Sequence, residues 1–182
     1  MELALIFLPL LASITSGFFG KYLGDRNSEI ITSLFVSISA LLSIVLFYQV
    51  IVNDYENNVV VATWINSGTL DVNWSIKVDA LSSVMLVVVT LVSALVHIYS
   101  IGYMSHDPHK PRFMAYLSLF TFSMLTLVTS DNFLQLFFGW EGVGLCSYFL
   151  IGFWFKKDSA NAAAIKAFVV NRVGDFGFAL GI

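Results

Sequence analysis

The sequence predicts an all-α, multi-pass membrane protein with about six membrane-spanning helices. Hydrophobic residues make up 58% of the 182 residues and charged residues 12%, whereas soluble domains carry about 25% charged residues. The mean hydropathy is +0.83. The apolar residues fall into long runs, as bilayer-crossing helices require. The net charge of -3 is small and spread over loops, so the sequence contains no basic surface that would indicate a nucleic-acid partner.

Five apolar stretches are long enough to span a bilayer, which takes about 20 residues, and a sixth nearly is. In chain order they are Leu3–Phe19, Ile30–Val52, Ala80–Tyr103, Phe113–Thr129, Phe133–Phe155 and Ala160–Ile182. The first lacks the positive start of a signal peptide, because Glu2 precedes it and the first basic residue is Lys21. We therefore expect it to be retained as a span. Residues 1–182 are predicted to form a single membrane domain.

The segment 53–78, between the second and third spans, is the one sizeable extramembrane piece. Val59–Ile65 and Leu70–Val78 are rich in β-branched and aromatic residues, and a turn-like Asn-Ser-Gly-Thr stretch separates them. This pattern predicts a short β-hairpin on the membrane surface. Trp64 and Trp74 suit the interface, where the ring is half buried and the indole N–H stays hydrated.

Lysine and arginine residues gather in alternate loops. The loops after the first, third and fifth spans each hold two of them, namely Lys21 and Arg26, Lys110 and Arg112, and Lys156 and Lys157. The loop after the second span holds only Lys77, and the loop after the fourth holds none. The positive-inside rule therefore places the first, third and fifth loops inside and the N-terminus outside.

One carboxylate, Glu141, lies near the middle of the fifth span. Counted from Asn132 at 1.5 Å per residue, it lies about 13 Å deep in a hydrocarbon core of roughly 30 Å. An ionisable side chain there costs roughly 2.5–3.5 kcal/mol or more, so protein, water or a counter-charge must compensate it. A proton relay is the favoured interpretation, and a permanently protonated, hydrogen-bonded glutamate is the structural alternative. Three glycines of this span indicate close helix packing: Gly139, Gly142 and Gly144.

Further charged or titratable residues lie within the other spans. Arg172 and Asp175 of the sixth span are three residues apart, so they share a helix face and can form an ion pair. Lys166 points elsewhere on the same helix, either to reach the interface or to take part in proton transfer. His97 lies well inside the third span and could pass protons. A neutral histidine bonded to a neighbouring helix explains His97 equally well.

Two blocks, DNFLQLFFGWEGVGLCSY at residues 131–148 and AAIKAFVVNRVGDF at residues 163–176, strongly resemble one family. It is subunit L (mitochondrial chain 5) of the proton-pumping NADH:quinone oxidoreductase, respiratory complex I. Residues 96–104 and 111–117 also fit, and the resemblance covers nearly the whole sequence. The Gly-Trp-Glu-Gly-Val-Gly motif is highly specific to this subunit and its antiporter relatives.

The resemblance implies an antiporter-like subunit of the membrane arm that takes part in redox-coupled proton translocation. Glu141 matches the carboxylate of a glutamate–lysine pair, and Arg172 and Asp175 match a charged pair near the adjacent antiporter-like subunit. The implied partners are the other membrane-arm subunits and the lipid bilayer. The implied location is a bacterial inner membrane or the mitochondrial inner membrane. No cofactor or metal is expected in this chain, because NADH, FMN, iron–sulfur clusters and quinone bind elsewhere in the complex.

Family members have a dozen or more spans, whereas this sequence stops at Ile182. The resemblance implies that the lysine that would partner Glu141 belongs to the next helix and is missing from the sequence, so we expect Glu141 to lack a counter-charge within these residues. Two alternatives stay open. One is the large subunit of a multisubunit sodium/proton antiporter. The other is a non-pumping membrane scaffold whose charges anchor its neighbours.

Overall fold

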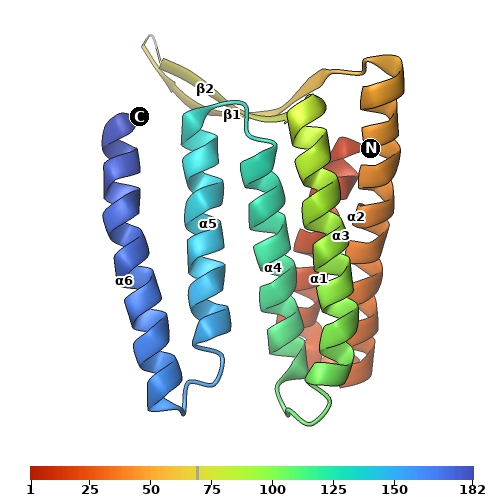
Figure 1. Ribbon diagram of the computed structural model, residues 1–182, viewed down its shortest axis with the longest axis vertical. Coiled ribbons are helices and arrows are strands. Elements are labelled where there is room, and N and C mark those ends of the chain that lie inside the picture. Colours follow the sequence, from red (N-terminus) through yellow and green to blue (C-terminus); the bar gives the residue numbers. More distant parts are fainter. Residues whose placement is uncertain (69) are drawn as a thin grey trace.

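The structure, a computed structural model, describes residues 1–68 and 70–182. Its described residues form six helices and a two-stranded antiparallel sheet (Figure 1). The elements are α1 (Glu2–Leu23), α2 (Asp25–Asn53), β1 (Asn57–Ser67), β2 (Leu70–Val78), α3 (Ala80–Tyr103), α4 (Lys110–Val128), α5 (Phe133–Ile151) and α6 (Asp158–Gly181). The predicted fold class is confirmed: a helical multi-pass protein with a hairpin between its second and third helices.

The helices α1 to α5 are long and apolar enough to cross a membrane. Helix α6 spans 24 residues beside them but includes four charged residues that lower its hydropathy, Asp158, Lys166, Arg172 and Asp175. This agrees with the expectation of five spans and a sixth that nearly qualifies. Helix boundaries depart from the apolar runs at some ends. Helix α2 begins five residues before Ile30, because Gly24, with φ of 77°, turns the chain without a steric penalty and lets α2 start at once.

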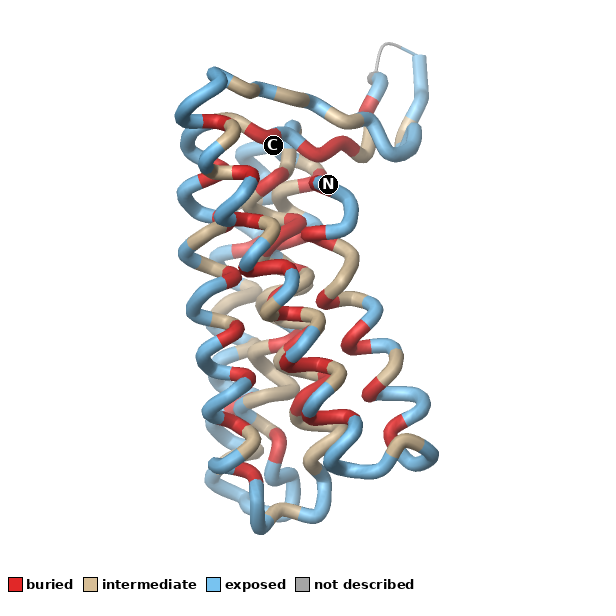
Figure 2. The backbone as a smooth tube through the Cα atoms, turned by 90° about the vertical axis from the view of Figure 1, so that its right-hand side faces the viewer, coloured by how far each residue is buried: buried red, intermediate tan, exposed pale blue. Residues whose placement is uncertain are grey.

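The helices pack as a four-helix group that extends into a row (Figure 1). Helix α1 packs against α2 and α4, α3 packs against α2 and α4, and α5 and α6 follow in turn from α4. Between α2 and α3 the contact is partly polar, since the hydroxyls of Ser43 and Thr90 lie 2.7 Å apart and are buried. Small hydroxyl residues let membrane helices approach closely and hydrogen-bond across the interface. Buried positions follow the facing sides of the helices and exposed ones the outside (Figure 2).

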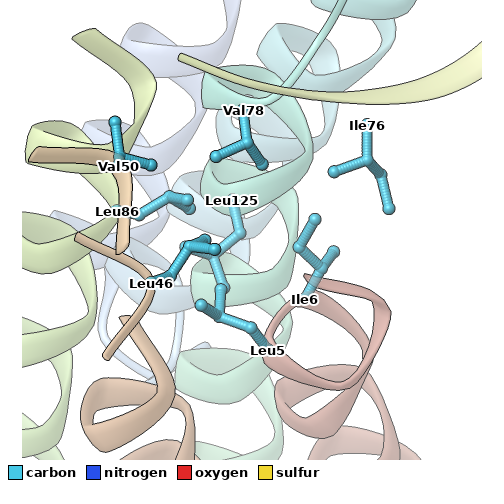
Figure 3. Close-up of a cluster of buried hydrophobic side chains, with 8 residues drawn as sticks. All are labelled: Leu5, Ile6, Leu46, Val50, Ile76, Val78, Leu86 and Leu125. Atoms are coloured by element: carbon cyan, nitrogen blue, oxygen red, sulfur yellow. The ribbon is translucent and has the colours of Figure 1, made fainter. Parts of the chain in front are cut away.

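An apolar core lies directly beneath the hairpin, where four helices and β2 converge (Figure 3). Its buried members are Leu5, Ile6, Leu46, Val50, Ile76, Val78, Leu86 and Leu125. Two of them, Ile76 and Val78, come from β2, so one face of the strand closes the bundle. The hairpin is therefore partly buried in the bundle, whereas the sequence predicted only that it lies on the membrane surface. For Ile76 and Val78, which lie on the extramembrane hairpin, burial away from water contributes about 1.5–3 kcal/mol each.

The hairpin is fixed to the loop between α4 and α5. The backbone N–H of Lys77 donates to the carbonyl oxygen of Thr129 at 2.9 Å, and Asn132 Nδ2 donates to the carbonyl of Asn73 at 2.9 Å. The rings of the two predicted interfacial tryptophans, Trp64 and Trp74, lie 5.3 Å apart, and both contact Phe138 of α5. One predicted turn residue, Thr69, lies outside the described residues.

The molecule has two chemically different ends (Figure 1). The N-terminus lies at the end that bears the hairpin, where Tyr55 Oη donates to Glu2 Oε1 at 2.7 Å. We call the other end the basic end, because the three basic loops identified in the sequence meet there. It holds Lys21, Arg26, Lys110, Arg112, Lys156 and Lys157. The alternation predicted from the sequence is therefore present in three dimensions.

Candidate functional site

The close approach of α5 to its neighbours depends on its glycines. A Cβ atom at Gly139 would lie 2.7 Å from the Cα of Leu127, and one at Gly142 would lie 2.9 Å from Ser123 Oγ. On the α6 side, a Cβ at Gly144 would lie 2.7 Å from Asn171 Nδ2. Each distance is shorter than a van der Waals contact allows. The three glycines thus let α5 lie close to both α4 and α6, and the predicted packing around Glu141 is confirmed.

Glu141 of α5 and two residues of α6 form a charged triad in the middle of these helices. Arg172 Nη1 donates a hydrogen bond to Glu141 Oε2 and lies 3.3 Å from Asp175 Oδ2. The side chain of Asp175 is only 4% exposed, against 25% for Glu141 and 37% for Arg172. The predicted Arg172–Asp175 pair is therefore present. The expectation that Glu141 lacks a counter-charge within these residues is wrong, because the tight α5–α6 packing brings Arg172 against it.

The two carboxylates do not share Arg172 equally. Glu141 receives the hydrogen bond of the guanidinium, whereas Asp175 Oδ2 is buried without a hydrogen bond despite its short distance to Arg172. The contact with Asp175 is thus electrostatic without good hydrogen-bond geometry. Two carboxylates and one guanidinium leave a formal net charge of -1, and binding one proton would make the triad neutral.

Two aromatic residues that the sequence interpretation missed position the triad. Trp140 Nε1 donates to Asp175 Oδ1 at 2.8 Å, and the Arg172 guanidinium lies 4.4 Å from the ring centroid of Phe168. Phe168 could have been found, because residues four apart share a helix face. The contact of Trp140 crosses between two helices, and nothing in the spacing along the chain indicates it.

A cleft of about 280 Å³ opens beside the triad between α5 and α6. Its lining includes the triad neighbour Trp140, the glycine contact pair Gly144 and Asn171, and the hydroxyl of Ser147. The amide and the hydroxyl can hydrogen-bond water. The cleft lies on the basic-end side of Glu141, since Gly144 and Ser147 follow Glu141 along α5 toward that end.

His97 lies apart from the triad, between α3 and α4. It is fully buried, with Nδ1 at 2.8 Å from the carbonyl oxygen of Ser93 and Nε2 at 3.0 Å from Ser118 Oγ. A carbonyl oxygen only accepts, so Nδ1 carries the hydrogen, and in the neutral ring Nε2 accepts from Ser118. Both nitrogens are thus satisfied, which favours the structural interpretation of His97.

Lys166 is also separate from the triad. Its side chain is exposed on α6, and no carboxylate oxygen of the described residues lies within 4.0 Å of its Nζ. It lies about two turns from the start of α6 at the basic end, close enough for its long stem to reach the interface. Roles for Lys166 and His97 in proton transfer stay predictions.

Comparisons with known proteins bear on the whole chain. The family profile described as NADH-Ubiquinone oxidoreductase (complex I), chain 5 N-terminus matches residues 64–114. The profile described as NADH:quinone oxidoreductase/Mrp antiporter, TM matches residues 130–182, which include the triad. NADH-ubiquinone oxidoreductase chain 5 of Arabidopsis thaliana is 58% identical over all 182 residues. NADH-quinone oxidoreductase subunit L of Rickettsia bellii is 51% identical over the same length. The resemblance to the chain 5 and subunit L family is confirmed.

The chain spans about a quarter of the length of these chain 5 and subunit L relatives, 27% of the Arabidopsis protein and 28% of the Rickettsia protein. The fold also resembles a chain in the structure of the membrane-bound sulfane sulfur reductase, an archaeal respiratory membrane complex. The TM-score is 0.84 over all of this chain and 36% of that one, at 18% identity. This likeness concerns the fold alone.

Proposed function

We propose that the chain forms part of a membrane-arm subunit of an H+-translocating NADH:quinone oxidoreductase, in which the triad of Glu141, Arg172 and Asp175 holds and releases a proton. The observation that carries the proposal is the placement of two carboxylates around one guanidinium, with Glu141 near the middle of α5. A structural ion pair would need only one carboxylate. The second one leaves a site that can gain a proton without creating a net charge.

The triad has two states that differ in the partner of Arg172. When Glu141 is ionised, the guanidinium binds it, as in the structure. When Glu141 is protonated, its attraction for Arg172 falls, and the guanidinium can turn fully to Asp175, from which Nη1 already lies 3.3 Å. Trp140 keeps Asp175 in place during this exchange through its hydrogen bond. A charge that approaches from a neighbouring subunit would shift the balance and change the proton affinity of Glu141.

The cleft beside the triad supports access from the basic end. Asn171 and Ser147 provide polar groups along an otherwise apolar surface. Water that enters there could carry protons toward Glu141, whose side chain remains 25% exposed. The basic end faces inward by the distribution of Lys and Arg, so this route would take protons from the inner side of an energy-transducing membrane.

The remaining parts of the proposal concern other chains. We propose that the partners are further membrane-arm subunits, including an adjacent antiporter-like subunit near Arg172 and Asp175. NADH, FMN, iron–sulfur clusters and quinone would bind elsewhere in the complex. The names of the relatives describe a chain and a subunit of an oxidoreductase, which supports the presence of partner subunits.

The test is Glu141→Gln in the full-length chain within the assembled complex. The matched control is Glu56→Gln, since Glu56 is an exposed carboxylate at the hairpin end. In membrane vesicles, the number of protons translocated per electron from NADH should fall in Glu141→Gln and stay unchanged in the control. An unchanged proton-to-electron ratio in Glu141→Gln would contradict the proposal.

A sodium/proton antiporter subunit is the second candidate, because the profile that covers the triad also describes Mrp antiporters. The purified assembly distinguishes the two: NADH oxidation coupled to proton transport supports the oxidoreductase, and sodium-driven proton exchange without NADH oxidation supports the antiporter. A scaffold would behave differently from both. Arg172→Ala would then abolish assembly, whereas Glu141→Gln would leave proton transport unchanged.

A further inference from the structure

A second cleft lies at the basic end, where α4, α5 and α6 meet. It has a volume of about 350 Å³ and combines polar and apolar walls. Arg112 of the first turn of α4 and Asn161 of the first turn of α6 provide polar groups, and Phe149, Phe153 and Ile165 provide apolar ones. A larger open cleft, of about 560 Å³, adjoins Arg112 from the α1 side and includes Lys21. Arg112 thus stands between two clefts.

The side chain of Arg112 is fixed by its neighbours, but several of its hydrogen-bond donors have no acceptor among the described residues. Its guanidinium packs against the rings of Phe153 and Phe155, with Cζ 4.6 Å and 5.4 Å from their centroids. Nη2 donates to the carbonyl of Phe153 at 3.1 Å, while Nε is buried without a hydrogen-bond partner. Among the described residues, no carboxylate oxygen lies within 4.0 Å of it. A guanidinium has five N–H donors, so Nη1 and the second hydrogen of Nη2 remain for a ligand.

Three charged side chains near Arg112 have partners of their own. Lys110 Nζ lies 3.8 Å from Glu29, Lys157 lies over the ring of Trp154 at 5.1 Å, and Asp107 accepts a hydrogen bond from Trp154 Nε1 at 2.9 Å. Helix α4 begins at this end without a side-chain cap or an acidic residue in its first turn, so its N-terminal N–H groups and dipole favour a negative charge there. Helix α6 has Asp158 in its first turn, which already complements its own dipole. The described residues that line the cleft include Arg112 and no acidic residue.

We propose that this cleft binds one anionic membrane phospholipid, with its phosphate on Arg112 and an acyl chain along Phe149 and Ile165. Arginine pairs with phosphate through two parallel hydrogen bonds, and aromatic rings that flank it keep the fork in one orientation. Basic pockets between membrane helices on the inner side are suited to lipid headgroups. A lipid accounts for the apolar wall as well as for the charge, whereas inorganic phosphate accounts for the charge alone.

The test uses the assembled complex with the full-length chain, reconstituted with phosphatidylglycerol that bears a photoreactive diazirine in its acyl chain. After illumination, lipid adducts on residues 148–165 are measured by mass spectrometry. We expect adducts in the unmodified protein and about tenfold fewer in Arg112→Gln, the loss typical of one charge-assisted hydrogen bond. Lys156→Gln is the matched control, because it removes a positive charge at the same end from a residue that does not line the cleft. Its adducts should be unchanged.

Further experiments distinguish a phospholipid headgroup from free inorganic phosphate as the ligand. Diazirine-bearing phosphatidylcholine should give fewer adducts than phosphatidylglycerol, and inorganic phosphate at tens of millimolar should not compete. Ile165→Trp, which fills the apolar wall and keeps Arg112, should also lose the adducts, and it replaces Arg112→Gln if that variant does not assemble. Adducts that are absent from residues 148–165, unaffected by both substitutions, or abolished by inorganic phosphate would each overturn the proposal.

Discussion

The side-chain amide of Gln135 binds the backbone of Ser75 as a neighbouring β-strand would. Gln135 Oε1 accepts from the N–H of Ser75 at 3.0 Å, and Nε2 donates to its carbonyl oxygen at 2.7 Å. Gln135 is fully buried, and its own position is fixed by the N-cap of α5, Asn132. Gln135 thus satisfies both backbone groups of Ser75 and adds to the other contacts that hold the hairpin on the bundle.

Replacing Gln135 by Leu should destabilise the protein by about 2 kcal/mol or more, because it leaves two buried backbone groups of Ser75 without partners. Thermal unfolding of the purified full-length chain in detergent measures the effect. The control is Asn58→Ala, which removes an exposed hydrogen bond from the hairpin to Asp131 and should cost less than about 0.5 kcal/mol. Equal losses from the two substitutions would show that Gln135 does not anchor the hairpin.

Gly139→Ala should disrupt the contact between α4 and α5. The added methyl group would lie 2.7 Å from the backbone of Leu127, and a backbone atom moves aside only if the whole helix shifts, at a cost of about 1–3 kcal/mol. Gly174→Ala is the matched control, since nothing lies within 4 Å of the added atom and alanine favours the helix. Thermal unfolding should give a loss in the first variant and no loss in the second. The opposite order would refute the close-packing argument.

Arg172→Gln should destabilise the α5–α6 pair by about 2 kcal/mol, a value between those of exposed and buried ion pairs because Arg172 is 37% exposed. The loss arises because Glu141 and Asp175 would face each other without a cation. The double variant Glu141→Gln/Arg172→Gln should recover much of it, since one carboxylate is then neutral. The unfolding temperatures of Glu141→Gln, Arg172→Gln and the double variant, compared with that of the unmodified protein, make a double-mutant cycle. Strictly additive losses would mean that the two side chains do not interact.

The capping box of α3 predicts a dependence on pH. Asp79 Oδ1 accepts from the N–H of Ser82 at 2.8 Å, and this hydrogen bond lowers the pKa of Asp79 below 3.8 although burial opposes it. A lowered folded pKa means that the stabilisation is present above pH 3.8 and is lost as the pH falls through the folded value. Asp79→Asn should still cap the helix, but its stability should not depend on pH in this range. Asp79→Ala removes the cap and should lower the free energy of unfolding by about 1 kcal/mol at neutral pH. Acid unfolding curves of the three proteins should separate accordingly, and parallel curves would exclude the effect.

The sequence predicted best the helices and strands whose ends are marked by turn or capping residues close by in the chain. The third span was predicted as Ala80–Tyr103 and found there, and the second strand as Leu70–Val78. Both begin or end at turn or capping residues that can be recognised in the sequence. The Arg172–Asp175 pair was predictable for the same reason, because its spacing follows from the helix repeat.

The contacts that escaped prediction depend on how one helix is rotated and shifted against another. The bond from Arg172 to Glu141 joins residues 31 positions apart, and the bond from Trp140 to Asp175 joins residues 35 positions apart. Neither the rotation of α6 nor its depth relative to α5 follows from the apolar pattern. Local spacing also does not reveal that Gln135 would bind Ser75 across 60 positions. The residues of the triad were therefore predictable from the sequence, but their arrangement was not.

Helix α6 falls outside the group that is apolar enough to cross a membrane unaided, yet its most deeply placed cation lies against Glu141 of α5. Charged residues near the middle of a helix oppose its transfer from the translocon into lipid. We infer that α5 and α6 enter the bilayer as a helical hairpin, in which Glu141 and Arg172 compensate each other before either meets lipid. Insertion assays of α6 with and without α5 would show this dependence. The triad would then be needed during biosynthesis, before any proton is moved.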